Sequence, residues 1–538
     1  MLLQHNLQSL FINQLTAGLQ KRAIVKPSQW AEKYRIMGTP FPGPYSFSNY
    51  PWTREMHDSK CELNIGQKSA QMGYTEVVLN VTFYKIDIER VSCLYVLPNS
   101  HPDAYQFSSA RFDVALELSP YIAEMFTDSK NIGHKRAGSA SLYLRSSNSR
   151  SQLKSVPTAF VVGDELEEFN QKNISLLNER TSGQVNKQVW FISTPSIPER
   201  GINSYFEKSS KEHFFFPCPS CSRLIDLQFP DNFIIDQDNP KIICNLCKGD
   251  IPHKAKSTIF APGKWVPQNT TKPEGRGFYI NQLYSPTVTP KEIMTAYTAA
   301  LRDPWAEQEF YNSKLGLAWE PQGASVKDSD IYRAIGSHNK GFRPNSPLIT
   351  MGVDIGKVLH YEVTNWIVTG DLALGIAEAC NAQVLDEGEV PDFNDLVNLI
   401  HFYNVRMTIL DAMPEIRKVQ EFCHAFPGRS MRCFYTQGCQ HREIIQVEDY
   451  VKVDRTAWLD CSLSRFRNGT ISLPMDVSQN YRKHICSPVR RYYKERDLTN
   501  TVKYESKSDD HLAHARNYSE IALQFIVTAG ENHDITSY

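Results

Sequence analysis

Two pairs of cysteines carry the most specific chemical signal in this chain. Cys218 and Cys221 form one CxxC pair, and Cys244 and Cys247 form a second pair after 22 intervening residues. Four thiolates at this spacing can close tetrahedrally on Zn²⁺, and a site with four cysteine ligands has no open position for catalysis. A redox role is the weaker alternative, because neither pair opens a helix after a strand. The sequence predicts a structural zinc site at about residues 213–251.

Two carboxylates lie in apolar runs of the last third of the chain. Asp354 lies inside the run Met351–Gly356, and Asp411 ends the run Met407–Ala412. A buried carboxylate is costly unless it is paired or bound to metal. Asp354 alone could equally serve a turn or a cap. The order of elements between the two runs, a strand meander, a helix and a returning strand, is RNase H-like and predicts that Asp354 and Asp411 lie side by side.

A third acidic group, Asp509 and Asp510, precedes the last predicted helix, and Asp510 is the favoured ligand. Three carboxylates in this arrangement suit two Mg²⁺ or Mn²⁺ ions about 4 Å apart, one activating water and the other stabilising the leaving 3′ oxygen. The helix is amphipathic, with apolar residues three or four apart. These apolar residues are Leu512, Ala515, Tyr518, Ala522 and Phe525.

The segment 66–75, GQKSAQMGYT, is similar to a phosphate-binding loop but departs from GxxxxGK[ST]. Tyr74 stands where lysine is usual, and Lys68 lies near the start of the loop, from where it could supply the cation for the β- and γ-phosphates. A plain turn from loop to helix is the alternative. The candidate ATP-binding residues here are Gly66, Lys68, Ser69, Gly73, Tyr74 and Thr75, with the Thr75 hydroxyl on Mg²⁺.

Two further strand ends favour nucleotide chemistry. The apolar run 159–163 ends in Asp164, a candidate Mg²⁺ ligand, and Glu165, a candidate for polarising the attacking water. A surface acidic pair after a strand is the alternative. The run 188–193 ends at Thr194, where a γ-phosphate sensor could lie.

The elements that must position these residues are of α/β type. Strand-like runs at 92–98, 158–165 and 188–194 alternate with helical patterns, which is typical of a parallel sheet whose sites gather at the carboxyl ends of the strands. A second α/β pattern begins at Leu348, with predicted strands at 348–356, 361–370, 373–383 and 405–413 and a helix at 392–404. The polar segment between the two patterns is predicted to be a linker.

Composition sets only broad limits. The 538 residues are 41% hydrophobic and 22% charged, as in a soluble globular protein of several domains. The 58 basic residues nearly balance the 59 acidic ones, so any phosphate contacts must be concentrated locally. Twelve cysteines, mostly scattered singly, fit a reducing compartment. No apolar run is long enough for a membrane span.

The order KSAQMGYT (68–75), VVGDELEEF (161–169) and FISTP (191–195) resembles bacteriophage terminase large subunits of the phage-lambda (GpA-like) type, whose phosphate-loop lysine is also early. The segments at 43–56, 277–286 and 310–320 agree, so the resemblance covers most of residues 26–320. It implies that Tyr50 or Trp52 stacks on adenine, although either could be core. Many members carry an acidic residue where this chain has His514, which leaves the choice between Asp509 and Asp510 open.

The resemblance implies a P-loop NTPase (RecA/ASCE-like) domain with a zinc-ribbon insertion, followed by an RNase H-like nuclease. The expected bounds are a helical lead-in (1–40), the packaging ATPase (41–325), a linker (326–346) and the endonuclease (347–538).

The expected partners are double-stranded viral DNA, the portal protein, the small terminase subunit and further copies of the chain in a ring on the procapsid, with no membrane. The expected location is the host cytoplasm and not the mature virion. The rivals are an ATP-dependent helicase with a nuclease tail and a non-catalytic zinc-stabilised docking protein. Basic residues interleaved with Tyr492 and Tyr493 could track DNA or form a solvated face. They are Arg465, Arg467, Arg490, Arg491, Lys494 and Arg496.

Overall fold

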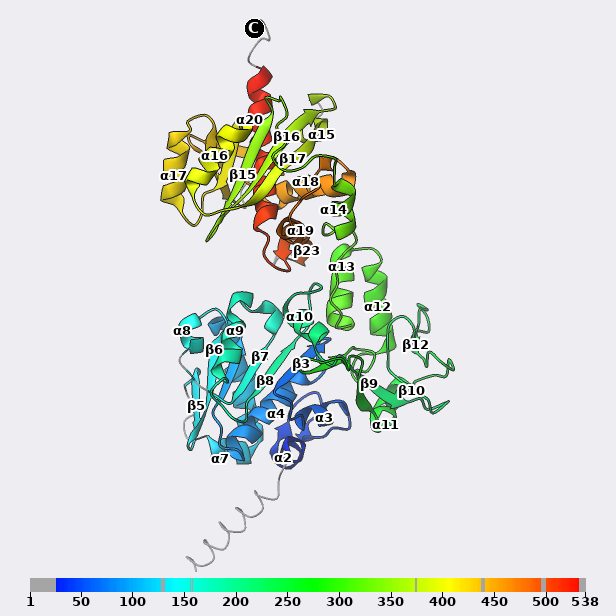
Figure 1. Ribbon diagram of the computed structural model, residues 1–538. Helices are drawn as coiled ribbons and strands as arrows, with labels where there is room; N and C mark the ends of the chain where they lie inside the picture. The colour runs from blue at the N-terminus through cyan, green and yellow to red at the C-terminus, as the bar shows by residue number, and fades with distance from the viewer. Residues whose placement is uncertain are drawn as a thin grey trace, which may run out of the picture. The chain divides into compact units, whose positions relative to one another are not determined.

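The computed structural model describes residues 26–531, except 127–130, 155, 157, 373–374, 437–440 and 495–499. It contains two compact units, Met1–Trp319 and Glu320–Tyr538 (Figure 1). Most of the expected lead-in lies outside the described residues, apart from α2 (Pro27–Tyr34) and its surroundings. None of the helices in the described ranges has the length and apolar character needed to cross a bilayer.

The first unit is built on a ten-stranded mixed sheet with the order β10-β9-β14-β3-β8-β7-β4-β6-β5, and β13 pairs with β9. All neighbours from β9 to β6 are parallel, whereas β10, β13 and β5 pair antiparallel. The strand bounds are β3 (Leu63–Lys68), β4 (Cys93–Leu97), β5 (His134–Ala137), β6 (Ala140–Ser146), β7 (Phe160–Asp164), β8 (Gln188–Ser193), β9 (Glu212–Pro217), β10 (Leu224–Ile225), β13 (Lys264–Pro267) and β14 (Arg276–Ile280).

The central strands form because each is a short run of branched and aromatic residues that buries both faces, as parallel sheets require. The predicted strands at 92–98, 158–165 and 188–194 are confirmed as β4, β7 and β8. One face packs against α4 (Tyr74–Asp87), and the other against α8 (Arg150–Lys154), α9 (Ser175–Arg180) and α10 (Gly201–Lys208) (Figure 1).

The cysteine-bearing insertion grows out of the same sheet. β9 leads directly to the first CxxC pair, and β11 (Phe233–Ile234) and β12 (Lys241–Ile242) form a separate two-stranded ribbon. The chain then returns through α11 (Lys256–Phe260), β13 and β14 to α12 (Pro290–Ala300) and α13 (Pro304–Glu309). The short elements near the start and along the β4–β6 connection are β1 (Ile36–Met37), β2 (Gly43–Pro44), α3 (Thr53–His57), α5 (Tyr105–Phe107), α6 (Val114–Leu118) and α7 (Pro120–Met125).

The second unit holds an eight-stranded sheet with the order β20-β21-β19-β18-β15-β16-β17-β22. β15, β16 and β17 form an antiparallel meander, and β18 returns parallel to β15, as the element order predicted. The strand bounds are β15 (Ile349–Ile355), β16 (Leu359–Val368), β17 (Cys380–Val390), β18 (Met407–Asp411), β19 (Ser430–Tyr435), β20 (Ile444–Val447), β21 (Tyr450–Val453) and β22 (Ile471–Ser472), with a hairpin of β23 (Pro488–Lys494) and β24 (Asn500–Ser506).

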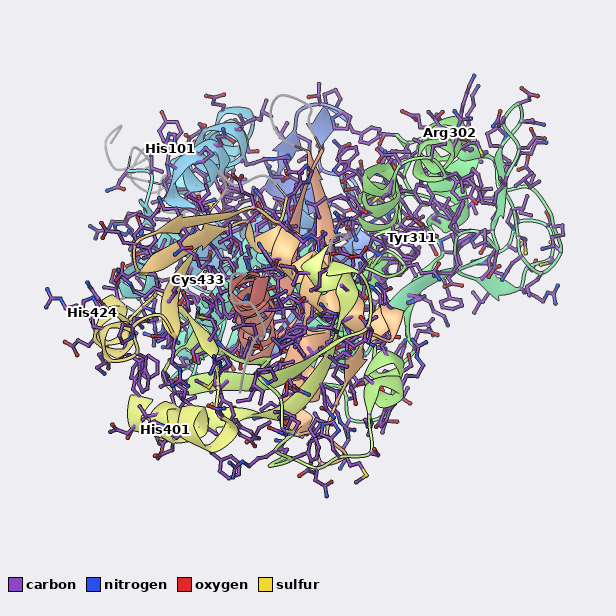
Figure 2. The ribbon with its side chains drawn as sticks, turned by 90° about the horizontal axis from the view of Figure 1, so that it is seen from above. His101, Arg302, Tyr311, His401, His424 and Cys433 are labelled. Carbon is purple, nitrogen blue, oxygen red and sulfur yellow. The ribbon has the colours of Figure 1, made fainter. Side chains whose placement is uncertain are left out.

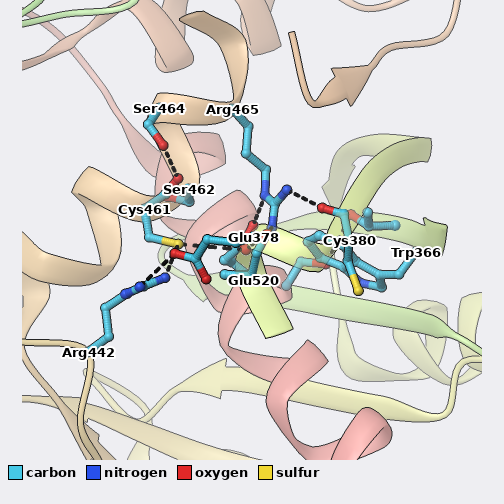
Figure 3. Close-up of polar contacts among 12 residues, drawn as sticks. Trp366, Glu378, Cys380, Arg442, Cys461, Ser462, Ser464, Arg465 and Glu520 are labelled. Atoms are coloured by element: carbon cyan, nitrogen blue, oxygen red, sulfur yellow. Dashed lines mark hydrogen bonds and ion pairs between the residues drawn. The ribbon is translucent and has the colours of Figure 1, made fainter. Parts of the chain in front are cut away.

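Helix α20 (His511–Glu531) packs across β15, β16 and β18 and carries a buried ionic network. Glu520 accepts a hydrogen bond from Arg465 of α18 (Arg455–Asn468) (Figure 3). It also accepts one from Arg516 of its own helix. The Arg465 guanidinium also donates to the Cys380 carbonyl, so it joins α18, α20 and β17. The other helices are α14 (Asp328–Ala334), α15 (Ile376–Ala379), α16 (Phe393–Tyr403), α17 (Ile416–Ala425) and α19 (Gln479–Cys486).

Two expected elements differ in the structure. The segment 373–383, expected as a strand, contains α15 before β17 begins at Cys380. The segment 326–346, expected as a linker, contains α14, and Ile331 of this helix is fully buried in the core of the second unit. A polar composition hid this helix, because only one of its faces is apolar.

Candidate functional sites

The loop between β3 and α4 presents unoccupied hydrogen-bond donors. β3 ends at Lys68, and α4 begins after Gly73, whose φ of +83° turns the chain into the helix. The backbone amides of residues 71–75 have no acceptor among the described residues, whereas Ser69 and Ala70 donate to the carbonyls of Ile280 and Ser313. Amides left open at the start of a 14-residue helix favour an anion.

Three of the residues predicted to bind ATP, Gly66, Tyr74 and Trp52, instead support this loop from within the core. Tyr74 is 1% exposed and its ring lies in the core, where Gly66 leaves room for it: a Cβ on Gly66 would lie 2.6 Å from the ring. Trp52 is fully buried and donates from Nε1 to the Met72 carbonyl at 3.1 Å. It therefore holds the loop from within the core and is not available to stack on a base. Tyr50 is half-buried next to Gly73 and stays the candidate for that contact.

Lys68 and Glu165 meet at the mouth of the loop. Lys68 Nζ lies 3.2 Å from Glu165 Oε1, and the Lys68 side chain is 7% exposed. Glu165 follows β7 in the left-handed region at φ 58°, a strained conformation for a non-glycine residue that often marks a functional site. Ser193 at the end of β8 donates to Glu165 Oε2 at 3.4 Å, and the half-buried Thr194 follows it.

Asp164 is a buried carboxylate with one oxygen left open. Tyr95 donates to Oδ2 at 2.6 Å, whereas Oδ1 is buried with no partner among the described residues. Burial, followed by the charge of Glu165, raises the pKa of Asp164 to about 6, and Thr75 and Lys68 oppose this shift. A cation at Oδ1 would compensate the buried charge, so Asp164 and Thr75 fit the Mg²⁺ of a bound nucleotide. The buried Ser69 hydroxyl also has no partner there.

Sequence reasoning missed Glu167, although it lies two residues from Glu165. Its buried carboxylate accepts from the Ile202 amide at 3.1 Å and from the Ser196 hydroxyl, and it lies 3.7 Å from Arg200. Glu167 thus joins the turn after β7 to the segment after β8. The sequence signal that could have pointed to Glu167 is the segment ELEE (165–168), which has three acidic residues.

The four cysteines converge as predicted. The sulfurs of Cys218, Cys221, Cys244 and Cys247 all lie within 4.8 Å of one another. Each pair sits in a tight turn in which the amide two residues after a cysteine points at its sulfur: Ser220 donates to Cys218 Sγ and Gly249 to Cys247 Sγ, both at 3.4 Å. Such amide donors stabilise thiolates. The arrangement fits one tetrahedral Zn²⁺ ion.

In the second unit, Asp354 and Asp411 end neighbouring parallel strands. The register pairs Val353 with Leu410, which puts the two carboxylates side by side, as predicted. Burial, with a contribution from the charge of Asp354, raises the pKa of Asp411 to about 6. Two carboxylates that repel each other in a partly buried site favour a divalent cation between them.

Asp509 and Asp510 differ clearly in their exposure to solvent. Asp509 is exposed, whereas Asp510 is turned inward, 3.3 Å from His514 Nε2 and 3.7 Å from Arg455. The hydrogen bond and charge of His514 hold the pKa of Asp510 well below its usual range despite burial. His514 also accepts from or donates to Tyr435 at 3.0 Å, so it belongs to the support of Asp510.

Two histidines near Asp354 escaped the sequence reasoning. His511 Nδ1 lies 2.8 Å from Asp354 Oδ2, and His360 is the cross-strand partner of Asp354 on β16. Ligand atoms of Asp354, His360 and His511 all lie within 4.8 Å of one another. A cross-strand neighbour cannot be read from the sequence without the register of the sheet, although His511 follows Asp510 directly.

The expected basic surface is largely paired. Arg465 is buried against Glu520, Arg490 bonds to Asp460 at 3.0 Å, and Arg491 to Glu505 at 2.7 Å. Arg467 donates to the Gly323 carbonyl. Arg496 and the side chain of Lys494 lie outside the described residues. Arg465 is therefore unavailable to a DNA backbone, and Arg467, Arg490 and Arg491 are held by neighbours.

These sites define a chain with a nucleotide-binding α/β unit, a four-cysteine insertion and a second unit of RNase H-like order with an acidic centre. Residues 39–265 match the family described as phage terminase large subunit gpA, ATPase domain, and residues 275–371 match terminase large subunit gpA, endonuclease domain. The two matches together cover more than half of the chain. The chain belongs to the gpA family of phage terminase large subunits and contains its ATPase and endonuclease domains.

Individual known proteins are similar to this chain over different shares of its length. The terminase large subunit of Enterobacteria phage P21 is 25% identical over 306 residues, which are 49% of this chain and 47% of that relative, so the match spans about half of the relative's length. The HK97 bacteriophage large terminase has a similar fold, with a TM-score of 0.51 and 11% identity over 92% of this chain and 98% of that one. The large terminase nuclease of thermophilic phage G20c, solved with bound magnesium, has a TM-score of 0.24 and 14% identity over 37% of this chain and 98% of that one.

Proposed function

We propose that this chain hydrolyses ATP to move double-stranded viral DNA into a procapsid and cuts concatemeric DNA with its second unit. The observation that carries the proposal is the Lys68–Glu165 ion pair beside a loop of open amides. It puts a cation and a general-base candidate side by side next to the open amides. The rival readings, a helicase and a non-catalytic docking protein, have no comparable support.

The nucleotide reaction follows from these residues. The open amides of 71–75 and the Lys68 ammonium would bind the phosphates, and Asp164 and Thr75 would hold Mg²⁺, which neutralises phosphate charge. When Lys68 turns to the phosphates, its bond to Glu165 is lost, and the freed carboxylate can orient and polarise the attacking water. The ion pair thereby keeps Glu165 inactive until a nucleotide is present.

The nuclease reaction is assigned to Asp354, Asp411 and Asp510. The first two lie on adjacent strands, and the third directly precedes α20, the helix that packs against both strands. These carboxylates would hold divalent cations, which activate water and stabilise the leaving oxygen in phosphodiester hydrolysis. The support of Asp510 by His514 and Arg455 keeps it ionised and therefore able to bind a cation.

The wider assignments rest on family membership and on the two units. We place the ATPase domain in the first unit, which ends at Trp319, and the endonuclease in the second unit, which begins at Glu320 and includes α14. We assign Zn²⁺ to the four cysteines. The chain would act as a ring of copies on the procapsid with the portal protein and the small terminase subunit. This assembly would work in the host cytoplasm and would not be part of the mature virion.

A pair of variants tests the two activities separately. Glu165→Gln should abolish ATP turnover but keep ATP binding, because the amide preserves shape and removes the base. Asp354→Ala should remove DNA cutting but spare the ATPase. The assays are phosphate release, binding of a labelled nucleotide and cleavage of linear DNA by the purified full chain. Substantial turnover by the first variant would contradict the ATPase assignment, and unaltered cutting by the second would contradict the nuclease assignment.

A further inference from the structure

A tyrosine on the strand next to β7 holds one oxygen of Asp164. Tyr95 lies in β4, and its hydroxyl donates to Asp164 Oδ2 at 2.6 Å. The register pairs Tyr95 with Val162, two residues before Asp164. Side chains alternate along a strand, so Asp164 shares the face of Val162 and Tyr95, which is the face that packs against α4. The sheet therefore brings the phenol within reach of the carboxylate.

The Tyr95 ring is fixed by its surroundings. It is fully buried, and it packs against the Phe107 ring of α5 with the centroids 4.4 Å apart. Phe107 is also buried, and it belongs to the segment that follows β4. His101 of the same segment lies exposed on the surface (Figure 2). Because the packed ring has no room to move away, the hydroxyl stays at the carboxylate.

The two oxygens of Asp164 are thereby made unequal. Oδ2 accepts the Tyr95 hydroxyl proton, because an ionised carboxylate has only acceptors. Oδ1 is buried and has no hydrogen-bond partner in the part of the chain that the structure describes. Hydrogen bonds to a metal-ligating carboxylate orient it, and their loss weakens metal binding by about 10–100-fold. Asp164 thus presents one free oxygen to the cation of a bound nucleotide.

The number of free oxygens distinguishes between cations. Mg²⁺ requires a near-octahedral shell of oxygen ligands and keeps several of its waters, whereas Ca²⁺ takes roughly six to eight oxygens and often both oxygens of one carboxylate. A carboxylate with one oxygen bonded to a buried phenol suits the first kind of shell. It is a poor ligand for an ion that would bind both of its oxygens.

We propose that Tyr95 is a positioning residue of the nucleotide site, which limits Asp164 to one metal-facing oxygen and thereby favours Mg²⁺ over Ca²⁺. The inference rests on the proposed nucleotide site and assigns the choice of cation to a residue outside the phosphate loop. The plain alternative is a core tyrosine whose hydroxyl is satisfied by the nearest acceptor. That alternative predicts no change in cation preference when the hydroxyl is removed.

The test measures binding of a fluorescent, non-hydrolysable ATP analogue to the full chain, in Mg²⁺ and separately in Ca²⁺. Tyr95→Phe keeps the ring and its contact with Phe107 but removes the hydroxyl. We expect this variant to lower the ratio of the affinity in Mg²⁺ to the affinity in Ca²⁺ by at least about tenfold. Phe107→Leu, which removes the ring support and leaves the hydroxyl, should lower the ratio in the same direction but to a smaller extent.

Tyr121→Phe is the matched control. The Tyr121 hydroxyl donates to Asp87 Oδ2 at 2.8 Å, so this variant also removes a hydrogen bond between tyrosine and aspartate from the first unit. Asp87 is the last residue of α4, at the opposite end of this helix from the phosphate loop. His101→Ala is the control for the segment that follows β4. Neither control should change the ratio, and thermal melting without nucleotide checks that each variant folds.

The outcomes separate this inference from the proposed function. If the wild type binds the analogue and Tyr95→Phe binds it with an unchanged ratio, the inference is overturned while the nucleotide site stands. Equal weakening in both cations would also overturn it, because Tyr95 would then support the site without choosing the cation. If Tyr95→Phe does not fold, the ratio in Phe107→Leu decides. If the wild type binds no nucleotide with either cation, the proposed ATPase fails and the inference fails with it.

Discussion

At the scale of single residues, a glycine from a distant part of the chain sets the position of the phosphate loop. Gly316 has φ +65°, and a Cβ there would lie 2.5 Å from the Ser69 nitrogen and 2.8 Å from the Lys68 carbonyl carbon. Both atoms belong to the backbone, so they cannot turn aside as a flexible side chain would. The close approach requires glycine at this position.

Gly316→Ala should therefore displace the loop. We expect loss of about 1–3 kcal/mol of stability and at least about a tenfold loss of nucleotide affinity, because overpacking moves the backbone to which we assign the phosphates. Gly323→Ala is the matched control: Gly323 also has a positive φ, +76°, but a Cβ there meets nothing within 4 Å. Thermal melting and titration with a labelled nucleotide measure both effects. Equal losses in the two variants would show that φ strain alone is responsible.

His57 predicts a pH dependence of the first unit. It is buried, donates from Nδ1 to the Thr53 carbonyl at 2.8 Å and accepts from Asn80 at Nε2. Burial lowers its pKa from 6.5 to about 4. Below pH 6.5 the unfolded chain protonates His57, whereas the folded chain does not do so until about pH 4. The free energy of unfolding is therefore highest above pH 6.5 and falls as the pH drops toward 4, by at most about 3 kcal/mol.

The measurement is the urea midpoint of the first unit between pH 7 and pH 4.5. His57→Gln should flatten this profile, because glutamine does not titrate and can keep both kinds of hydrogen bond. A variant at the exposed His401 serves as the control, since it should leave the profile of the wild type unchanged. An equally steep profile in His57→Gln would assign the acid sensitivity to other groups.

At the scale of elements, the cysteine-bearing insertion is joined to the ten-stranded sheet of the first unit through one strand, β9. β9 pairs with β14, which pairs with β3, and Cys218 follows the end of β9 directly. Phe214 and Phe216 of β9 are buried in the main core of the unit. Loss of zinc should therefore loosen the edge of the sheet that leads to the loop.

Cys244→Ser should abolish zinc binding and lower the melting temperature of the first unit, because a structural zinc site contributes directly to folding. Zinc content per chain and thermal melting give the two readings. Cys61→Ser is the control, since Cys61 is half-buried and lies outside the cluster. A full complement of zinc in the Cys244 variant would contradict the ligand assignment.

The sequence predicted elements well where periodicity was strong. β4, β7, β8, β15 and β18 follow from short apolar β-rich runs, and the RNase H-like order follows from their sequence. The helix α15 did not, because its four residues lie in an apolar segment in which helix and strand look alike.

Site residues divide in the same way. Lys68, Glu165, Asp354 and the cysteines carry chemistry in their type and spacing. The roles of Trp52 and Tyr74 as buried supports, and the meeting of His360 with Asp354, depend on side-chain direction and strand register. Those are properties of the folded chain, and a single sequence does not reveal them.

At the scale of the whole molecule, each unit has its own buried cores. The clusters around Trp52 and Ile65 belong to the first unit, and those around Trp366, Met351 and Tyr518 belong to the second. Units with separate cores unfold as separate cooperative transitions when few contacts join them.

Calorimetry of the full chain should therefore show two transitions. A non-hydrolysable ATP analogue with Mg²⁺ at about a hundred times its dissociation constant should stabilise the first unit by about 2.7 kcal/mol and leave the second transition in place. The Lys68→Ala variant, which removes the cation, is the control and should lose this shift. A single transition that moves as a whole would contradict independent units.

The last segment of the first unit, residues 313–319, is hydrogen-bonded at its start to the loop between β3 and α4. At its end it is bonded to the segment that follows β8. Ser313 accepts from Ala70 at 2.9 Å, Gly316 from Gln67 at 3.0 Å, and Trp319 donates to Ser196 at 2.9 Å. The second unit begins at the very next residue. A displacement of the loop between β3 and α4 would therefore be passed through these three hydrogen bonds to the peptide that leads into the second unit.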